Sequence, residues 1–197
     1  MRRVLPTEAA TIIILNGVSS VGKSSISRAL QAVTAAPFLY VEMDAYLAAM
    51  PLKYQDHPDG LSYEHGQANG RPTMQVKTGE VAERALSGMR HAAAAMAGQG
   101  NNLIIDEVFF GDRDNGFCNP VAEYRRLLTP YTLKMVGVFA LLEVIEAREA
   151  ARGDRMVGMA RWQFDEIHHG MRYDLEVDSS AASPDECAWH IKAAFGL

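Results

Sequence analysis

A glycine-rich motif at 17–24 contains the first candidate functional residues of the chain. The segment Gly17-Val-Ser-Ser-Val-Gly-Lys-Ser24 matches the pattern G-x-x-x-x-G-K-[ST] of phosphate-binding loops. Glycines let such a loop turn its backbone N–H groups toward a phosphate, and the helix that follows adds the positive end of its dipole. Lys23 would add a full charge near the β- and γ-phosphates, and the Ser24 hydroxyl suits Mg²⁺. The pattern therefore predicts a site for ATP and Mg²⁺.

This P-loop supplies the residues expected to hold the nucleotide. They are Gly17, Ser19, Ser20, Gly22, Lys23, Ser24 and Ser25. The context is the one that the motif requires, because a β-rich apolar run precedes it at 11–16 and a helical pattern follows it at 23–33. Lys23 is expected to act on the transferred phosphoryl group as well.

A metal site beside the phosphates needs an acid. Asp106 ends the apolar run 102–106, and Glu107 follows it. The carboxyl ends of parallel strands border the ligand crevice of such sheets. We therefore expect Asp106, together with Ser24, to hold Mg²⁺, the aspartate through water. Alternatively the two carboxylates cap the next segment, and for Glu107 the metal, the acceptor and such a cap all stay open.

Asp44 follows a second strand pattern at 38–43, which should end at the same rim of the sheet. A carboxylate there can orient an acceptor hydroxyl, because the loose transition state of phosphoryl transfer makes even a weak base sufficient. Alternatively Asp44 is the N-cap of a short helix that starts at Ala45, and the two roles are compatible. The apolar residues that follow are candidates for contact with the acceptor or for core packing: Leu47, Met50 and Leu52.

Arg148, Arg152 and Arg155 share one face of a helical pattern, which Gly153 could end. Clustered guanidinium groups suit the charge that spreads over phosphoryl oxygens in the transition state. These arginines are therefore candidate catalytic residues, on a lid at about 152–160. The alternative is a solvated face that pairs with the neighbouring acidic side chains.

Strand and helix patterns alternate along the chain around these candidate site residues. Further strand patterns cover 133–141 and 173–177, and helical patterns cover 78–98, 143–152 and 160–168. A last helix opens with the capping box Ser183-Pro-Asp-Glu186. On 78–98 the apolar stripe consists of Val81, Ala85, Met89, Ala92 and Met96. We expect one α/β domain over 1–197, with the P-loop NTPase fold: a mainly parallel five-stranded sheet flanked by helices, with a small lid.

Residues 51–77 interrupt the regular alternation. They are rich in Pro, Gly, Asp, His and Tyr and show no hydrophobic period. A loop of this length in a compact domain is either functional or disordered. We expect a functional flap there, with disorder as the alternative.

The composition excludes several classes of protein. The chain has 19 Lys and Arg against 24 Asp and Glu, a net charge of −5, so nucleic acid is not an expected partner. Cys118 and Cys187 are far apart, which fits a reducing compartment better than a disulfide framework. No stretch approaches the roughly 20 apolar residues of a membrane span. We expect a cytoplasmic protein that acts on a small hydroxylated molecule, and its oligomeric state stays open.

With these residues assembled, the chain resembles the chloramphenicol phosphotransferases, small P-loop kinases that phosphorylate the primary hydroxyl of that antibiotic. The similarity covers nearly the whole chain, and the arginine stretch and the C-terminal part are more specific to the family than the P-loop. The matching segments are Ile-Ile-Leu-Asn-Gly-Val-Ser-Ser-Val-Gly-Lys-Ser (13–24), Met43-Asp44 with Ala-Ala-Met-Pro-Leu-Lys (48–53), Ile-Ile-Asp-Glu-Val-Phe (104–109), Arg-Glu-Ala-Ala-Arg-Gly-Asp-Arg (148–155), Gly158-Met159-Ala160, Tyr-Asp-Leu-Glu-Val-Asp (173–178) and Glu-Cys-Ala-Trp (186–189).

The resemblance implies transfer of the γ-phosphoryl group of ATP to a hydroxyl of a small molecule. Chloramphenicol or a similar antibiotic is the first candidate, which would make the chain a resistance protein. Asp44 matches the family's catalytic aspartate, and Arg148, Arg152 and Arg155 fall in its lid.

Two residues and one segment depart from the family pattern. Ala45 stands where a serine is expected beside the catalytic aspartate, and Glu107 stands where a second aspartate is expected. The stretch 54–77, with His57, Tyr63 and His65, matches least. The identity of the acceptor is therefore the part of the function that the resemblance determines least.

Other functions compete with a small-molecule O-kinase. A kinase of another metabolite, or a toxin-type kinase of a nucleotide sugar, would also combine a P-loop with an aspartate, but the toxin type predicts a basic acceptor pocket that the sequence does not indicate. A nucleotide-binding module without catalysis would need neither Asp44 nor the arginines. An ATPase assay with and without acceptors distinguishes this last class from the kinases.

Overall fold

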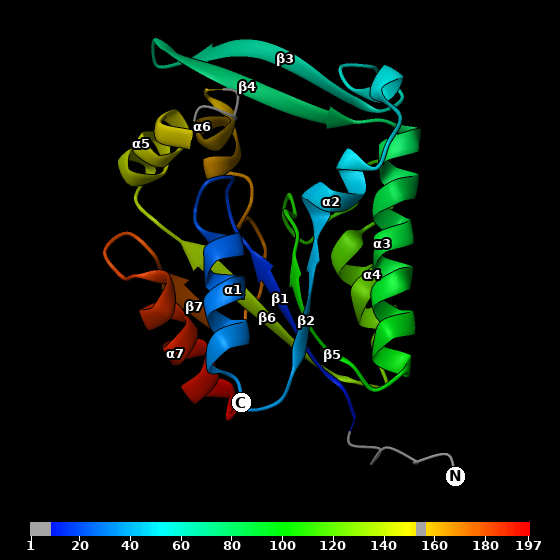
Figure 1. Cartoon of the computed structure of the whole chain (residues 1–197). Helices are drawn as coiled ribbons and strands as arrows, with labels where there is room; N and C mark the ends of the chain where they lie inside the picture. The colour runs from blue at the N-terminus through cyan, green and yellow to red at the C-terminus, as the bar shows by residue number, and fades with distance from the viewer. Residues whose placement is uncertain (1–8, 153–156) are drawn as a thin grey trace.

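The computed structural model describes residues 9–152 and 157–197. Within these residues, five parallel strands form one sheet in the order β2-β5-β1-β6-β7 (Figure 1). The strands are β1 (Thr11–Asn16), β2 (Phe38–Glu42), β5 (Asn102–Asp106), β6 (Thr132–Phe139) and β7 (Leu175–Asp178). The predicted fold class is confirmed, and β1, which carries the P-loop at its end, is the central strand.

Helices cover both faces of the sheet (Figure 1). They are α1 (Lys23–Val33), α2 (Met43–Ala48), α3 (Glu80–Gly98), α4 (Pro120–Leu127), α5 (Leu142–Arg152), α6 (Met159–Phe164) and α7 (Pro184–Phe195). Ile12 and Ile14 belong to the core on the side of α3 and α4, whereas Ile13 and Leu15 belong to the core on the side of α1 and α7. Because both faces of β1 are buried, its sequence is an uninterrupted apolar run.

The apolar stripe predicted for α3 is displaced by about one residue. Of the predicted residues only Met89 is fully buried, and the others are partly buried. The buried apolar residues of α3 are Ala82, Leu86, Met89, Ala93 and Ala97. Glu83 and Arg90 are buried on the same helix face. Hydrophobic periodicity cannot predict this, because charged side chains are buried only where the fold provides them with partners.

The stretch predicted to lack regular structure forms an antiparallel hairpin. Its strands are β3 (Leu61–Ala68) and β4 (Arg71–Thr78), and a short 3-10 helix, Leu52–Tyr54, precedes them. Asn69 and Gly70 connect the strands with φ angles of 51° and 74°. Two consecutive positive φ angles are what a two-residue hairpin turn requires, and Asn-Gly is its strongest sequence signal. The local signal was therefore present in the sequence.

The hairpin packs against α6 and lies across the top of the molecule in Figure 1, beyond the carboxyl ends of the strands. The Met74 N–H donates to the Gly158 carbonyl over 3.0 Å. Gly158 has a φ of 101°, and a Cβ there would lie 2.7 Å from the Pro72 carbonyl oxygen. The buried Glu149 of α5 accepts from the N–H groups of Gly158 and Ala160 over 2.8 and 2.9 Å. These contacts connect α5, α6 and the hairpin into one structural unit.

The remaining predicted elements differ from the structure mainly at their ends. The helix predicted at 160–168 ends at Phe164 and continues as turns, and the capping box of Ser183 and Glu186 is confirmed. In the described ranges, no helix is both long and apolar enough to cross a membrane.

Replacement of Glu149 by alanine should destabilise the α6 region. It leaves two buried N–H groups at the start of α6 without their acceptor, which costs about 1–3 kcal/mol. Urea unfolding of Glu149→Ala measures the loss, with Glu143→Ala, on the exposed side of the same helix, as the control. Equal stability of the two variants would contradict this role for Glu149.

Candidate active site

The P-loop connects the end of β1 to the start of α1, and glycine is required at both of its ends. A Cβ on Gly17 would lie 2.5 Å from the Val138 carbonyl oxygen, so the loop can approach β6 only with glycine there. Gly22 has a φ of 105°, which side chains rarely allow. Ser20, between them, also has a positive φ of 62°. Strained backbone of this kind is typical of ligand-binding loops.

The start of α1 offers an anion site at the end of this loop. Gly22 is the N-cap residue and has no side chain that could occupy the N–H groups of the first turn, which Lys23, Ser24 and Ser25 form. The Lys23 ammonium is buried and donates to the carbonyl oxygens of Gly17 and Val18 over 2.9 and 3.3 Å. Free N–H groups, a helix dipole and a fixed positive charge together suit phosphate.

Asp106, at the end of β5, lies beside Lys23. Its Oδ1 is 3.7 Å from the Lys23 Nζ, and its Oδ2 accepts from the Tyr40 hydroxyl over 3.1 Å. Burial raises the pKa of Asp106 above its usual range, against the opposing effects of the Lys23 charge and the Tyr40 hydrogen bond. The contact with Lys23 favours the ionised form that a metal ligand requires.

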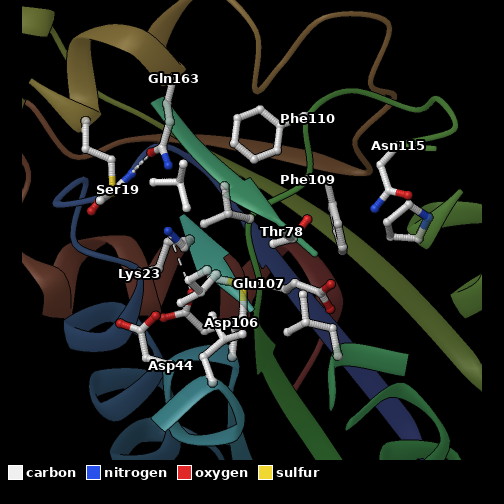
Figure 2. A pocket seen from close by; sticks show the side chains of 18 of the residues that line it. Ser19, Lys23, Asp44, Thr78, Asp106, Glu107, Phe109, Phe110, Asn115 and Gln163 are labelled. Atoms are coloured by element: carbon white, nitrogen blue, oxygen red, sulfur yellow. Dashed lines mark hydrogen bonds and ion pairs between the residues drawn. The ribbon is translucent and has the colours of Figure 1, made fainter. Parts of the chain in front are cut away.

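Asp44 lies in the first turn of α2, next to the same strand ends. Glu42 occupies the N-cap position of α2, so Asp44 is inside the helix and the alternative N-cap role predicted for it is not found. The negative charge of Asp44 contributes to raising the pKa of Asp106, after the larger effect of burial. Figure 2 shows Lys23, Asp44 and Asp106 converging on one side of a cavity.

This cavity, the hairpin cavity, has a volume of about 510 Å³ and extends from the P-loop to the hairpin. Its apolar lining includes Leu47, Leu61, Leu86, Phe109, Phe110 and Trp162. The Phe110 and Trp162 rings lie 4.9 Å apart, centroid to centroid. A cavity of this size with apolar walls and a few charged groups suits a small organic molecule.

A hydrogen bond of Gln163 connects α6 to the P-loop, and both residues of this bond line the hairpin cavity. Its Oε1 accepts from the Ser19 N–H over 2.7 Å, and the side chain is almost fully buried (Figure 2). The backbone of Ser19 thus contacts α6, while the first turn of α1 faces the cavity. The P-loop is therefore connected to α6 just after the segment 152–160 that was predicted to be a lid, of which residues 153–156 lie outside the described ranges.

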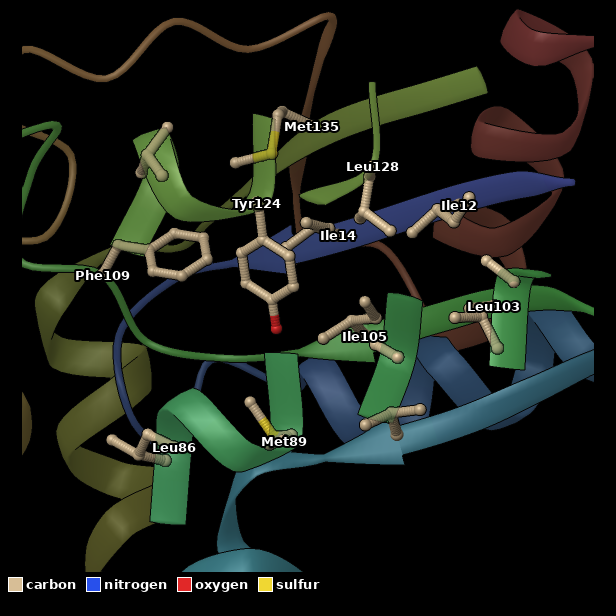
Figure 3. Packing of buried hydrophobic residues seen from close by; sticks show 14 of the residues in the cluster. Ile12, Ile14, Leu86, Met89, Leu103, Ile105, Phe109, Tyr124, Leu128 and Met135 are labelled. Atoms are coloured by element: carbon tan, nitrogen blue, oxygen red, sulfur yellow. The ribbon is translucent and has the colours of Figure 1, made fainter. Parts of the chain in front are cut away.

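Glu107 forms a buried ion pair. The Arg90 guanidinium donates to its Oε1, through Nε over 3.1 Å, and the Tyr124 hydroxyl donates to its Oε2 over 2.7 Å. The Tyr124 ring itself is packed against Phe109 in the core (Figure 3). Glu107 lines the hairpin cavity but uses both oxygens to connect β5 with α3 and α4. This pairing favours a positioning role over a metal ligand.

A further cavity lies on the other side of the P-loop. This α7 cavity has a volume of about 490 Å³ and is lined by the first turn of α1, by Arg148 and Arg152, and by Ser179, Ala182 and Pro184. Arg148 donates to the carbonyl oxygens of Val21 and Ser179 over 3.2 and 2.7 Å. Arg152 lines both cavities, and Arg155 lies outside the described residues. The structure thus separates Arg148 from the hairpin cavity.

The apolar residues predicted to contact the acceptor have different positions. Leu47 lines the hairpin cavity. Met50 is buried in the core between the sheet and α3, which was the alternative given for it. Leu52 is 87 % exposed on the 3-10 helix, so it contacts neither the cavity nor the core. Only Leu47 of these three is brought to the site.

Several residues of the site could not be found from sequence motifs. Tyr40, Arg90 and Gln163 contact Asp106, Glu107 and the P-loop only because distant segments meet in the fold. The hairpin β3–β4 could have been predicted from its Asn-Gly turn. Its position relative to the P-loop could not have been predicted from the sequence.

The described residues contain no group of three or more His, Cys, Asp or Glu side chains placed to bind a metal ion. Ser24 and Asp106 both line the hairpin cavity next to Lys23. This sparse oxygen set fits Mg²⁺, which keeps several waters and binds phosphates alongside one or two protein ligands.

Curated relatives are similar over most of their length. "Putative O-phosphotransferase Rv2636" of Mycobacterium tuberculosis strain H37Rv is 27% identical over 189 residues, which are 93% of this chain and 81% of the relative. "Putative O-phosphotransferase MT2714" of strain CDC 1551 matches to the same extent. These names describe the relatives.

Solved structures of kinases share the fold. A sugar kinase from Janibacter sp. has a TM-score of 0.61 at 16% identity and covers 95% of each chain. The APS kinase CysC of Mycobacterium tuberculosis, solved with AMPPNP and APS, has a TM-score of 0.60 at 14% identity and covers 96% of this chain and 99% of its own. At such identities the likeness establishes the architecture alone.

A family comparison covers almost the whole chain. The family model described as "Chloramphenicol phosphotransferase-like protein" matches residues 10–196, from β1 to the end of α7. The match includes the P-loop, Asp44 and the arginines of α5, so the resemblance inferred from the sequence is confirmed. The chain belongs to the chloramphenicol phosphotransferase-like family.

Proposed function

We propose that the protein is an ATP-dependent O-phosphotransferase, which moves the γ-phosphoryl group of ATP onto a hydroxyl of a small molecule. The observation that carries this proposal is the position of the P-loop between the hairpin cavity and the α7 cavity. Ser20, Gly22, Ser24 and Arg152 line both. A phosphate chain held there can have its nucleoside on one side and an acceptor on the other.

The α7 cavity is the proposed nucleoside side. It borders the first turn of α1, and Arg148 and Ser179 form part of its wall. The α- and β-phosphates would lie against the P-loop N–H groups, and Lys23 would neutralise charge on the β- and γ-phosphates. With the nucleoside in the α7 cavity, the γ-phosphate is directed toward the hairpin cavity.

The hairpin cavity is the proposed acceptor side. Asp44 and Asp106 both line it, but Asp106 is paired with Lys23 whereas Asp44 lies one strand further out, at the start of α2. We assign Asp44 the alignment of the acceptor hydroxyl and acceptance of its proton. Since proton transfer can be late in a loose transition state, an ordinary carboxylate is sufficient.

Ser24 and Asp106 are the residues that would hold Mg²⁺, the aspartate through water. When bound, this ion neutralises charge on the β- and γ-phosphate oxygens. Arg152 lines both cavities and is proposed to stabilise the transferred group, and Arg155 is proposed to act with it in the segment 152–160. Arg148 is proposed to contribute from the nucleoside side.

We further propose that the segment 152–160 and the hairpin flap close over the bound substrates. The proposed location of the protein is the cytoplasm.

Chloramphenicol is the first acceptor to test, because the family is defined by its phosphorylation. The curated relatives are named as O-phosphotransferases, and the match with each of them covers 93% of this chain. Ala45, next to Asp44, and the hairpin depart from the family pattern, and residues of the hairpin line the proposed acceptor side. Other hydroxylated compounds therefore belong in the same screen.

The Asp44→Asn variant should lose transfer while retaining nucleotide binding. General-base assistance is worth about 10²–10⁴-fold in rate, so single-turnover transfer should slow by that order. Asp185→Asn, in the exposed first turn of α7, is the matched control. The assignment is wrong if nucleotide affinity collapses in Asp44→Asn while the rate per bound complex survives.

The Lys23→Ala variant should lose phosphoryl transfer by about 10²–10³-fold or more, because a preorganised charge beside the transferred group disappears. The variant loses the charge that pairs with the buried Asp106 and should be less stable, but the hydrogen bond from Tyr40 to Asp106 remains and the protein should still fold. Transfer assays are read together with circular dichroism, with Lys53→Ala as the surface control. Full turnover by a folded Lys23→Ala protein would remove the P-loop assignment.

Ser24→Ala and Asp106→Asn should each raise the Mg²⁺ concentration needed for half-maximal activity, since each removes an oxygen group of the proposed metal site. A magnesium titration at saturating ATP measures the change. Unchanged titration curves for both variants would contradict the metal placement.

A further inference from the structure

Glu83 is a buried carboxylate of the hairpin cavity that the proposed reaction does not use. It lies near the start of α3 and is only 6% exposed. Its Oε1 accepts from the Thr78 hydroxyl over 2.5 Å and from the Asn115 side-chain amide over 3.0 Å. Its Oε2 is buried and has no hydrogen-bond partner in the described part of the chain. Because a buried carboxylate oxygen without a donor is costly, a donor on a bound molecule would stabilise Oε2.

The negative charge around Glu83 exceeds the positive charge. Arg90 pairs with Glu107 and donates to the Glu123 carboxylate over 3.0 Å, so one guanidinium is shared between two carboxylates before Glu83 is counted. Burial raises the pKa of Glu107, Arg90 opposes that rise, and the charge of Glu83 adds to it. Three carboxylates therefore share one guanidinium, and the region carries a net negative charge.

Three other cationic side chains that line the hairpin cavity pair with acids other than Glu83. Lys77 pairs with Glu64 over 2.6 Å on the exposed side of the hairpin. Arg113 pairs with Glu166 over 2.5 Å. Lys23 pairs with Asp106 at the P-loop. An ammonium group on a molecule that enters the cavity would supply the positive charge that these three side chains do not bring to Glu83.

The position of Glu83 matches one end of a bound acceptor. Its partners Thr78 and Asn115 lie across the cavity from Asp44 and Lys23 in Figure 2. Apolar and aromatic side chains, including Leu86 and Phe109, line the space between. A molecule that spans the cavity would meet an acid at each end and apolar walls in the middle.

We propose that the acceptor carries an ammonium group that binds the Glu83 carboxylate, while its hydroxyl lies at Asp44. This inference rests on the proposed function, because it assigns the hairpin cavity to the acceptor. Thr78 and Asn115 hold Oε1 and direct the carboxylate, and Oε2 receives the ammonium. A purely structural role for Glu83 explains the bonds to Oε1 but leaves the burial of Oε2 without compensation.

Three matched probes test the ammonium group at neutral pH. They are para-(aminoethyl)benzyl alcohol, its N-acetyl derivative and para-ethylbenzyl alcohol, which share the hydroxyl and the ring. Binding is measured through the fluorescence of Trp162, which lines the cavity, so no turnover is needed. The amine should bind roughly tenfold to a hundredfold more tightly than the other two, as expected for a charge-assisted hydrogen bond.

The matched variants are Glu83→Gln and Glu80→Gln. The first keeps an oxygen for Thr78 and Asn115 and removes the charge; the second removes an exposed charge from the same helix turn. Glu83→Gln should lose the preference for the amine, and Glu80→Gln should retain it. Equal binding of the three probes to the unmodified protein, a preference for the N-acetyl form, no binding of the amine, or an unchanged preference in Glu83→Gln would each overturn the proposal.

A negative result for the contact between Glu83 and an ammonium group is distinguishable from a negative result for the proposed function. Binding of the probes requires neither ATP nor transfer, whereas the proposed function is tested by transfer of the phosphoryl group and by its loss in Asp44→Asn. A protein that phosphorylates a neutral alcohol in preference to the amine would keep its proposed function and refute the role of Glu83. Chloramphenicol, whose nitrogen is acylated, would then rank above free amines.

Discussion

The parallel register of β1, β5 and β2 is the constraint on which the whole site depends. It pairs Leu15 with Asp106 and Asp106 with Glu42, so the three strands end at one rim. The P-loop leaves β1 there, and Lys23 returns to within 3.7 Å of Asp106. Because both groups are buried, either charge alone would be costly, and the register is what brings them together. The same register places Asp44, two residues beyond Glu42, beside them.

Buried polar contacts then build the walls of the cavity around this rim. Arg90, Glu107 and Tyr124 connect α3, β5 and α4, and Gln163 connects α6 to the P-loop. Glu149 holds the start of α6, against which the hairpin packs. Each of these groups is buried with its partners, so the cavity can be lined by charged residues although the sheet on either side is packed by apolar side chains. Shape and charge of the acceptor side therefore have a common origin.

The sequence predicted those parts that are encoded locally. The P-loop between an apolar run and a helix, the five strands and the capping box at Ser183 all depend on residues close together in the chain. The hairpin was encoded locally too, by Asn69 and Gly70, but its irregular composition concealed it. Tyr40, Gln163 and the pairing of Glu107 with Arg90 depend on segments brought together by the sheet and its crossovers, and no local pattern reports them. The same limit applies to three apolar residues after Asp44: only the fold shows that Leu47 lines the cavity, Met50 is in the core and Leu52 is exposed.

We propose that an acceptor hydroxyl in the hairpin cavity receives a phosphoryl group from ATP held at the P-loop. The most direct measurement is mass spectrometry of hydroxylated compounds, chloramphenicol and amino alcohols included, after incubation with the protein, ATP and Mg²⁺. We expect an acceptor that gains the mass of one phosphate, with one ADP formed for each product, and no gain with the Asp44→Asn protein. ATP hydrolysis that is independent of every acceptor, or an equal gain with Asp44→Asn, would contradict it.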